Sequence, residues 1–147
     1  MSLIQWDQSY SVKVPEFDED HRTIFALINK LHEAMSQGCG RAILGGVFDE
    51  LVDYTMRHFA AEERLLEMHD DYPEIDTHKA AHEKFRQQVV DLRRQYDAGA
   101  LHISVEVALF LKSWLKNHIL TMDKRYGDFL AGRHHPSAER EMESCNP

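Results

Sequence analysis

Four stretches of the chain carry apolar residues at alternating steps of three and four, which is the spacing of one face of an α-helix. The third stretch is the most regular, and its inward positions are Ile75, His78, His82, Phe85, Val89, Leu92 and Tyr96. No segment shows the alternating pattern of a β-strand, and the connections between the four stretches are short. Short connections make neighbouring helices antiparallel. The sequence therefore predicts an all-α protein, an antiparallel up-down-up-down four-helix bundle.

We expect the 147 residues to form one bundle domain over residues 1–131 and a polar C-terminal tail over residues 132–147. Pro73 is expected in the first turn of the third helix, where its missing N–H would have no partner in any case. Gly45 and Gly46 lie inside the second helix and are expected to loosen its first turns. The helices themselves are expected over residues 18–37, 41–70, 73–97 and 103–131.

The segment before the first helix, residues 1–17, is expected to be an extended N-terminal arm. Pro15 blocks a helix just before the first apolar stripe, and Asp18 is a suitable N-cap for the helix that follows. Trp6 and Tyr10 are the side chains expected to pin this arm to the bundle.

The composition argues against several classes of protein. A formal charge of −8 and the lack of a basic stripe disfavour nucleic acid as a partner. No apolar run reaches the roughly 18–20 residues of a membrane span, and the first residues lack the basic start and apolar core of a signal peptide. We therefore expect a cytoplasmic protein with no membrane span. Cys39 and Cys145 lie far apart and form no CxxC motif, which indicates incidental thiols.

Ionisable residues interrupt the apolar stripe of every expected helix, although such groups are costly to bury unless something satisfies them. Two pairs are spaced i, i+4, so the members of each pair lie one above the other on a helix face. In an up-down bundle the starts of odd helices meet the ends of even ones, and all of these residues lie at such positions. The sequence therefore predicts that seven groups converge at one end: His21, His58, Glu62, His78, His82, His118 and Asp123.

The step from His118 to Asp123 is irregular. Five residues leave two side chains about 140° apart on a regular helix, which is poor for a single metal ion. Two explanations remain open: Asp123 reaches across to a second metal ion, or a π-type turn rewinds the helix between the two residues.

Seven such groups in a dry core indicate a cation, because five imidazoles and two carboxylates would be unstable together without one. Imidazole suits zinc, copper, iron and nickel, and seven ligands exceed the four of a tetrahedral zinc site. Carboxylate bridges across two metal ions are therefore expected. The HExxH motif of zinc proteases is absent, since Arg86 stands where a second histidine would follow His82 and Glu83. The Glu-x-x-His pairs of ferritin-type bundles are absent as well.

The order of these residues resembles that of the hemerythrins. The family's pattern is a first-helix histidine followed by HxxxE, HxxxH and HxxxxD. It stands here as His21, His58-Phe-Ala-Ala-Glu62, His78-Lys-Ala-Ala-His82 and His118-Ile-Leu-Thr-Met-Asp123. The segments Trp6-Asp-Gln-Ser-Tyr10 and Trp114-Leu-Lys-Asn-His118 are also similar to the family, so the resemblance covers about residues 6–130.

The resemblance implies two inequivalent iron ions per chain. One iron would take His78, His82 and His118, and the other His21 and His58, with an open position for dioxygen. Glu62 and Asp123 would bridge the two irons together with a solvent-derived oxo or hydroxo group. The resemblance also implies an apolar dioxygen pocket, matched here by Phe59, Trp114, Leu115 and Ile119.

The function expected from this resemblance is reversible binding of dioxygen, as a carrier or store of the bacterial type, without catalysis. A histidine-rich site is less anionic than a carboxylate-rich one, which favours binding over oxidation. The sequence shows no obvious proton donor beside the site, which favours binding over turnover. Three alternatives remain: a sensor acting through a separate partner, a peroxidase or scavenger of nitric oxide or peroxide, and a bundle that merely holds iron. A carrier would pass dioxygen to an unidentified oxygen-consuming enzyme.

Overall fold

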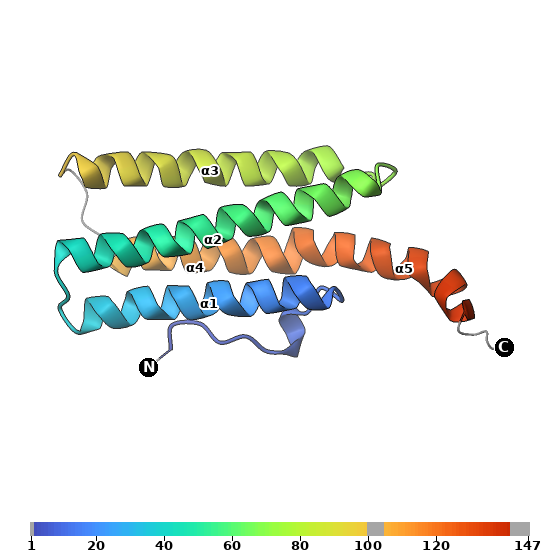
Figure 1. Ribbon diagram of the computed structural model, residues 1–147, viewed down its shortest axis with the longest axis horizontal. Helices are drawn as coiled ribbons and strands as arrows, with labels where there is room; N and C mark the ends of the chain where they lie inside the picture. The colour runs from blue at the N-terminus through green and yellow to red at the C-terminus, as the bar shows by residue number, and fades with distance from the viewer. Residues whose placement is uncertain (1, 100–104, 142–147) are drawn as a thin grey trace.

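The computed structural model describes residues 2–99 and 105–141, with side chains described as far as Gly132. Figure 1 shows four long helical rods lying side by side and alternating in direction, with no strand among the described residues. This confirms the predicted all-α four-helix bundle. None of the described helices is long and apolar enough to cross a membrane. The helices are α1 (Pro15–Ser36), α2 (Arg41–Met68), α3 (Ile75–Asp97), α4 (Val105–His118) and α5 (Lys124–Glu141).

The fourth rod consists of α4, a π-helical turn over Ile119–Asp123, and α5. The sequence predicts that this helix starts near residue 103 and gives way to a polar tail at residue 132. Residues 100–104 lie outside the described residues, and the helix continues to Glu141. Gly132 does not end the rod, because a single glycine inside a helix costs only about 1 kcal/mol relative to alanine.

Two helices begin at positions other than those predicted. α1 starts at Pro15, whose fixed φ suits the first helical position, and its N-cap is Val14 rather than Asp18. The Asp18 carboxylate instead accepts hydrogen bonds from the Val12 amide at 2.8 Å and from the Ser11 hydroxyl at 2.6 Å. α3 starts two residues after Pro73, which lies in the turn that follows α2.

The N-terminal arm is held on α1 by hydrogen bonds between its backbone and the side chain of Asn29. Asn29 accepts from the amides of Leu3 at 2.8 Å and Ile4 at 3.0 Å, and its own amide donates to the Ile4 carbonyl at 2.7 Å. The two aromatic residues expected to pin the arm both contact α1. Tyr10 meets the edge of Phe25 at 5.1 Å, and the Arg22 guanidinium lies 4.0 Å from the centroid of the Trp6 ring.

The arm also crosses α5 at very close range. A Cβ atom built on Gly127 would lie 2.1 Å from the carbonyl oxygen of Val12, far inside any tolerated contact. Lys13, which follows Val12, has a positive φ of 64° and pairs with Asp128 at 2.8 Å. Only glycine at position 127 therefore allows the arm to lie where it does.

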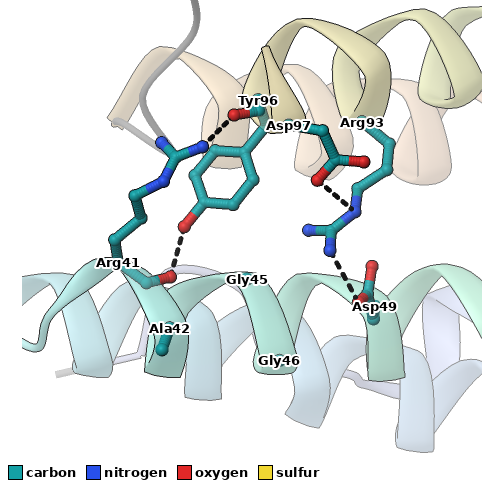
Figure 2. A pocket seen from close by; sticks show the side chains of 8 residues that line it. All are labelled: Arg41, Ala42, Gly45, Gly46, Asp49, Arg93, Tyr96 and Asp97. Atoms are coloured by element: carbon teal, nitrogen blue, oxygen red, sulfur yellow. Dashed lines mark hydrogen bonds and ion pairs between the residues drawn. The ribbon is translucent and has the colours of Figure 1, made fainter. Parts of the chain in front are cut away.

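At the end of the bundle where α2 begins and α3 ends, polar contacts join these two helices (Figure 2). The Tyr96 hydroxyl donates to the Arg41 carbonyl, and the Arg41 guanidinium donates back to the Tyr96 carbonyl. A Cβ on Gly45 would lie 3.0 Å from the Tyr96 ring. Gly45 therefore allows close packing of α2 against α3 inside a regular helix, rather than loosening the first turns of α2 as predicted. Between the two ends, buried apolar side chains fill the core, including Ile28, Leu31, Phe48, Leu51, Val89 and Leu111.

Candidate metal centre

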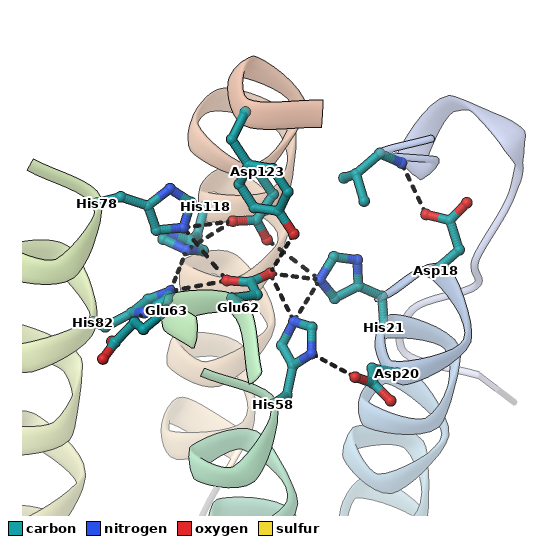
Figure 3. Close-up of polar contacts among 12 residues, drawn as sticks. Asp18, Asp20, His21, His58, Glu62, Glu63, His78, His82, His118 and Asp123 are labelled. Atoms are coloured by element: carbon teal, nitrogen blue, oxygen red, sulfur yellow. Dashed lines mark hydrogen bonds and ion pairs between the residues drawn. The ribbon is translucent and has the colours of Figure 1, made fainter. Parts of the chain in front are cut away.

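The seven predicted side chains converge at the end of the bundle opposite to Arg41 and Tyr96 (Figure 3). None of them is more than 5% exposed, and Glu62 and His82 are fully buried. They come from all four rods: α1, the second half of α2, the start of α3, and the junction of α4 with α5. We call these seven residues the His/carboxylate cluster.

The π turn places Asp123 on the inward face. The Lys124 amide donates to the Ile119 carbonyl five residues earlier, which is the hydrogen bond of a π turn. One such turn takes five residues to come nearly full circle, so His118 and Asp123 face the same way. The Asp123 Oδ1 atom lies 3.1 Å from His118 Nε2. Of the two explanations left open for this spacing, the rewound turn is present.

The cluster divides into two groups of donor atoms, each lying within 4.8 Å of one another. Glu62 and Asp123 belong to both groups, so each carboxylate faces both sides. Glu62 Oε2 lies 2.8 Å from His58 Nε2, whereas its Oε1 lies 3.1 Å from His82 Nε2. The five-residue group is Glu62, His78, His82, His118 and Asp123, and the four-residue group is His21, His58, Glu62 and Asp123.

The cluster contains polar atoms that the protein leaves unsatisfied. Glu62 Oε1, Asp123 Oδ1 and both ring nitrogens of His78 are buried and make no hydrogen bond of normal geometry, although His78 Nε2 lies only 3.0 Å from Asp123 Oδ1. His82 Nε2 and His118 Nε2 face each other at 3.0 Å, as do His58 Nε2 and His21 Nε2. Inward-facing lone pairs beside carboxylate oxygens are what a bound cation satisfies. The residues present therefore fit metal binding at this place.

The charges of the cluster shift one another strongly when no metal is bound. Burial alone would lower the pKa of His58, but the Glu62 charge and hydrogen bonds to Asp20 and Glu62 raise it to about 10. Burial also opposes protonation of His78, but its contacts with Asp123 and Glu62 raise its pKa to about 9. Burial disfavours the charged form of Glu62, yet His58 and the other imidazoles hold the pKa of this carboxyl well below its ordinary value. Protons thus occupy the centre until metal ions displace them.

Sequence reasoning missed two carboxylates just outside the cluster. His58 Nδ1 donates to Asp20 at 2.7 Å, and His82 Nδ1 donates to Glu63 at 2.7 Å. Each carboxylate is the sequence neighbour of a cluster residue, next to His21 in one case and Glu62 in the other. That adjacency was the available signal. Neighbours on a helix point in different directions, however, and a hydrogen bond to a residue of another helix cannot be read from spacing.

A tyrosine hydroxyl lies beside the cluster, where the sequence shows no obvious proton donor. Tyr126 is fully buried, and its hydroxyl lies 3.4 Å from Glu62 Oε2. Burial and the nearby Glu62 and Asp123 charges raise the pKa of Tyr126 well above 10, so the phenol stays protonated. The periodicity of the fourth helix places Tyr126 on its inward face. Spacing alone gives no sign that the hydroxyl lies beside a carboxylate rather than among apolar side chains.

The four residues matched to the apolar pocket all lie near this end of the core. Leu115 and Ile119 are buried at 2% and 1% exposure. The Phe59 ring stacks on His82 at 3.8 Å and also contacts His58 at 6.4 Å, so it touches both groups. Trp114 stacks on His118 at 4.5 Å. The Phe59 and Trp114 rings therefore lie directly against imidazoles of the cluster.

The remaining histidines and cysteines do not join the cluster as far as the structure describes them. His32 lies on α1 and His69 at the end of α2, and neither belongs to the two donor groups. Cys39 is a free, partly exposed thiol between α1 and α2. His102 and Cys145 lie outside the described residues, and the side chains of His134 and His135 are not described.

Comparison with known proteins supports what the geometry indicates. The sequence model of one protein family, the hemerythrin HHE cation-binding domain, matches residues 12–130. The chain belongs to the hemerythrin family. The matched segment contains all seven residues of the His/carboxylate cluster.

Several bacterial hemerythrins are similar over nearly their whole length. The bacteriohemerythrin of Stenotrophomonas maltophilia is 41% identical over 128 residues, which cover 87% of this chain and 82% of that protein. The bacteriohemerythrin of Methylococcus capsulatus is 34% identical over 132 residues, covering 89% of this chain and 99% of that protein. A crystal structure of a wild-type hemerythrin superposes with a TM-score of 0.82 at 34% identity, covering 86% of this chain and 97% of that one.

Proposed function

We propose that this hemerythrin binds dioxygen reversibly at a centre of two iron ions, as a carrier or store. The observation that carries the proposal is the pair of donor groups that share Glu62 and Asp123. Two shared carboxylates between two sets of imidazoles are the arrangement expected for a bridged pair of metal ions, rather than for one ion. The family membership makes iron the metal we propose.

The two donor groups suggest which residues hold which ion. We assign His78, His82 and His118 to one ion and His21 and His58 to the other. The second ion then has one protein ligand fewer and so keeps room for a small molecule. Iron bound there would supply the electrons that reversible binding of dioxygen requires.

The apolar walls keep the centre selective. Phe59, Trp114, Leu115 and Ile119 present no hydrogen-bonding group to the cluster except the indole N–H of Trp114. A hydrophobic shell of this kind limits access of water and anions, which would otherwise compete for the open position. An uncharged diatomic molecule passes such a wall at far lower desolvation cost than an anion does.

Tyr126 supports binding rather than turnover. Its hydroxyl donates toward Glu62, and its raised pKa means that it gives up this proton poorly. General acid catalysis works best when the pKa of the acid lies near the working pH. The structure thus contains a buried hydrogen-bond donor beside the centre that is a poor catalytic acid.

The test is anaerobic loading with ferrous iron, followed by metal counting and visible spectra through repeated cycles of air and vacuum. We expect two irons per chain and an absorption band that appears with air and disappears under vacuum. The protein loaded with zinc is the control and should show no such band. A band that appears once and never reverses would instead indicate oxidation, and assays of peroxide turnover would then follow.

A further inference from the structure

Each of the two donor groups has a carboxylate just outside it that hydrogen-bonds to one of its histidines, and the surroundings of these two carboxylates differ. In each group one histidine turns its Nε2 inward and donates its Nδ1 hydrogen to a carboxylate: His58 to Asp20 and His82 to Glu63. Such a bond fixes the tautomer that leaves Nε2 free to bind metal, and it fixes the plane of the ring. Each half of the centre therefore has one histidine positioned by an outer carboxylate.

The carboxylate behind His82 is shielded and paired with a cation. Glu63 also accepts a hydrogen bond from the Arg86 guanidinium at 3.0 Å, and its side chain is 17% exposed. The ring of His82 is itself held flat against Phe59 at 3.8 Å. The histidine of the five-residue group thus has a second restraint besides its carboxylate.

The carboxylate behind His58 is more open, and no lysine or arginine among the described residues pairs with it. Asp20 accepts its other hydrogen bond from the uncharged hydroxyl of Tyr54 at 3.0 Å, and its side chain is 27% exposed. Among the described residues His58 has no stacked aromatic partner: it meets Phe17 edge-on at 5.3 Å and Phe59 at a tilt at 6.4 Å. The orientation of His58 therefore depends chiefly on Asp20.

A pocket leads from the surface to this point. Its volume is about 230 Å³, and it is lined by Asp20, Tyr54, Arg57 and His58. Within this lining, the Asp20 carboxylate accepts the hydrogen bond from the imidazole of His58, which belongs to the four-residue group (Figure 3). A rotation of His58 away from Asp20 would withdraw one of the two histidines of the four-residue group, the one that also lines the pocket.

We propose that Asp20 is the positioning residue that retains the metal ion of the four-residue group, and that this ion enters and leaves through the pocket lined by Asp20, Tyr54 and Arg57. This inference rests on the proposed two-metal centre and deepens it. It makes the two ions kinetically distinct: the ion in the four-residue group loads last and is lost first. The ion in the five-residue group, held by one ligand more and backed by Glu63 with Arg86, is retained.

The test follows the release of iron from the full-length protein after anaerobic loading with two equivalents of ferrous iron. A strong ferrous chelator is added and release is recorded by absorbance. We expect two phases in the unmodified protein, each of one ion. Asp20→Asn should accelerate the fast phase by about 10–100-fold, the range usual for loss of an outer carboxylate, and leave the slow phase unchanged. Glu63→Gln is the matched control and should accelerate the slow phase only.

Two more variants test the pocket. Tyr54→Phe removes the hydroxyl donor to Asp20 and should accelerate the fast phase by a smaller factor than Asp20→Asn. Arg57→Ala widens the pocket and should accelerate both uptake and release of one ion while leaving its equilibrium dissociation constant unchanged. Helical circular dichroism of the metal-free variants shows whether each has folded.

The outcomes separate the two proposals. If the unmodified protein never takes up two ions, the proposed function fails. If it takes up two but Asp20→Asn changes both phases equally or neither phase, the role of Asp20 is overturned and the two-metal centre stands. An unchanged rate in Arg57→Ala overturns the pocket as the route.

Discussion

Removal of a single cluster side chain should change the number of metal ions bound per chain, and His82 is the clearest case. Its Nε2 belongs only to the five-residue group, and its Nδ1 is bound to Glu63. We predict that His82→Ala lowers the metal content from two ions to one per chain while the chain stays helical, because one donor group loses a third of its imidazoles and the rest of the core is untouched.

Metal analysis of the purified variant after ferrous loading checks this prediction. His32→Ala is a suitable control, since His32 lies eleven residues after His21 on the same helix and outside both groups. It should retain two ions. Two ions retained in His82→Ala would show that the ligand assignment is wrong.

A substitution at Leu115 tests whether this residue belongs to the proposed apolar wall. It is 2% exposed, and replacing a buried leucine by alanine leaves a cavity and costs about 2–5 kcal/mol. We predict that Leu115→Ala speeds the conversion of the air-exposed protein to its ferric form, because water gains access to the centre. Leu111→Ala, one turn earlier on α4 and 1% exposed, controls for the loss of stability. Equal rates in the two variants would remove Leu115 from the wall.

Among the structural elements, the N-terminal arm depends most visibly on one position. Its backbone at Val12 passes so close to Gly127 that no Cβ fits between them. We predict that Gly127→Ala lowers the free energy of unfolding by about 1–3 kcal/mol, the usual range for overpacking, and frees the arm. Urea unfolding measures the first effect and proteolysis of the arm the second. Gly132→Ala on the same helix meets no atom within 4 Å and should not destabilise the protein.

The π turn shows how far an element can be anticipated from sequence. The five-residue step between His118 and Asp123 does not fit a regular helix with both side chains facing inward. A rewound turn is one of two explanations consistent with this step. Spacing alone cannot choose between them, because the side chain of an aspartate can also reach sideways. Only the hydrogen bond from Lys124 to Ile119 decides the matter.

At the scale of the whole molecule, the shifted pKa values predict how stability varies with pH when no metal is bound. His58 and His78 have pKa values raised to about 10 and about 9 from an ordinary 6.5. A group whose pKa is raised in the folded state stabilises the fold fully below its unfolded pKa of 6.5. This contribution is lost as the pH rises through the pKa that the group has in the folded state. Glu62 and Asp123, whose pKa values are lowered, stabilise it above their ordinary values of 4.5 and 3.8.

The metal-free protein should therefore be most stable in mildly acidic solution and should weaken steadily from pH 6.5 toward pH 10. The metal-loaded protein should lack this alkaline decline, since metal ions replace the protons, and should instead weaken in acid, where protons compete for the ligands. Thermal unfolding of both forms across this range checks the prediction. A metal-free protein that gains stability toward pH 10 would contradict it.

Much of this architecture follows from sequence because it rests on local periodicity. The stripes of the four helices predict the bundle, and the heights of the seven polar residues predict that they meet at one end. What could not be predicted depends on contacts between segments far apart in the chain. Asp20 acquires its role from His58 on another helix, and Gly127 from the path of Val12. Helix ends also shifted, because Pro15 begins α1 and Pro73 precedes α3.

The position of the cluster at one end of the bundle has a further consequence for how the cell can produce this protein. Ile28, Leu31, Phe48, Leu51 and Leu111 form an apolar core whose burial does not involve the cluster residues. Burial of this core does not require a metal ion, so we expect it to drive folding of the metal-free chain. Under the two-iron centre proposed above, a chain synthesised while iron is scarce would already be folded and would take up its metal ions later.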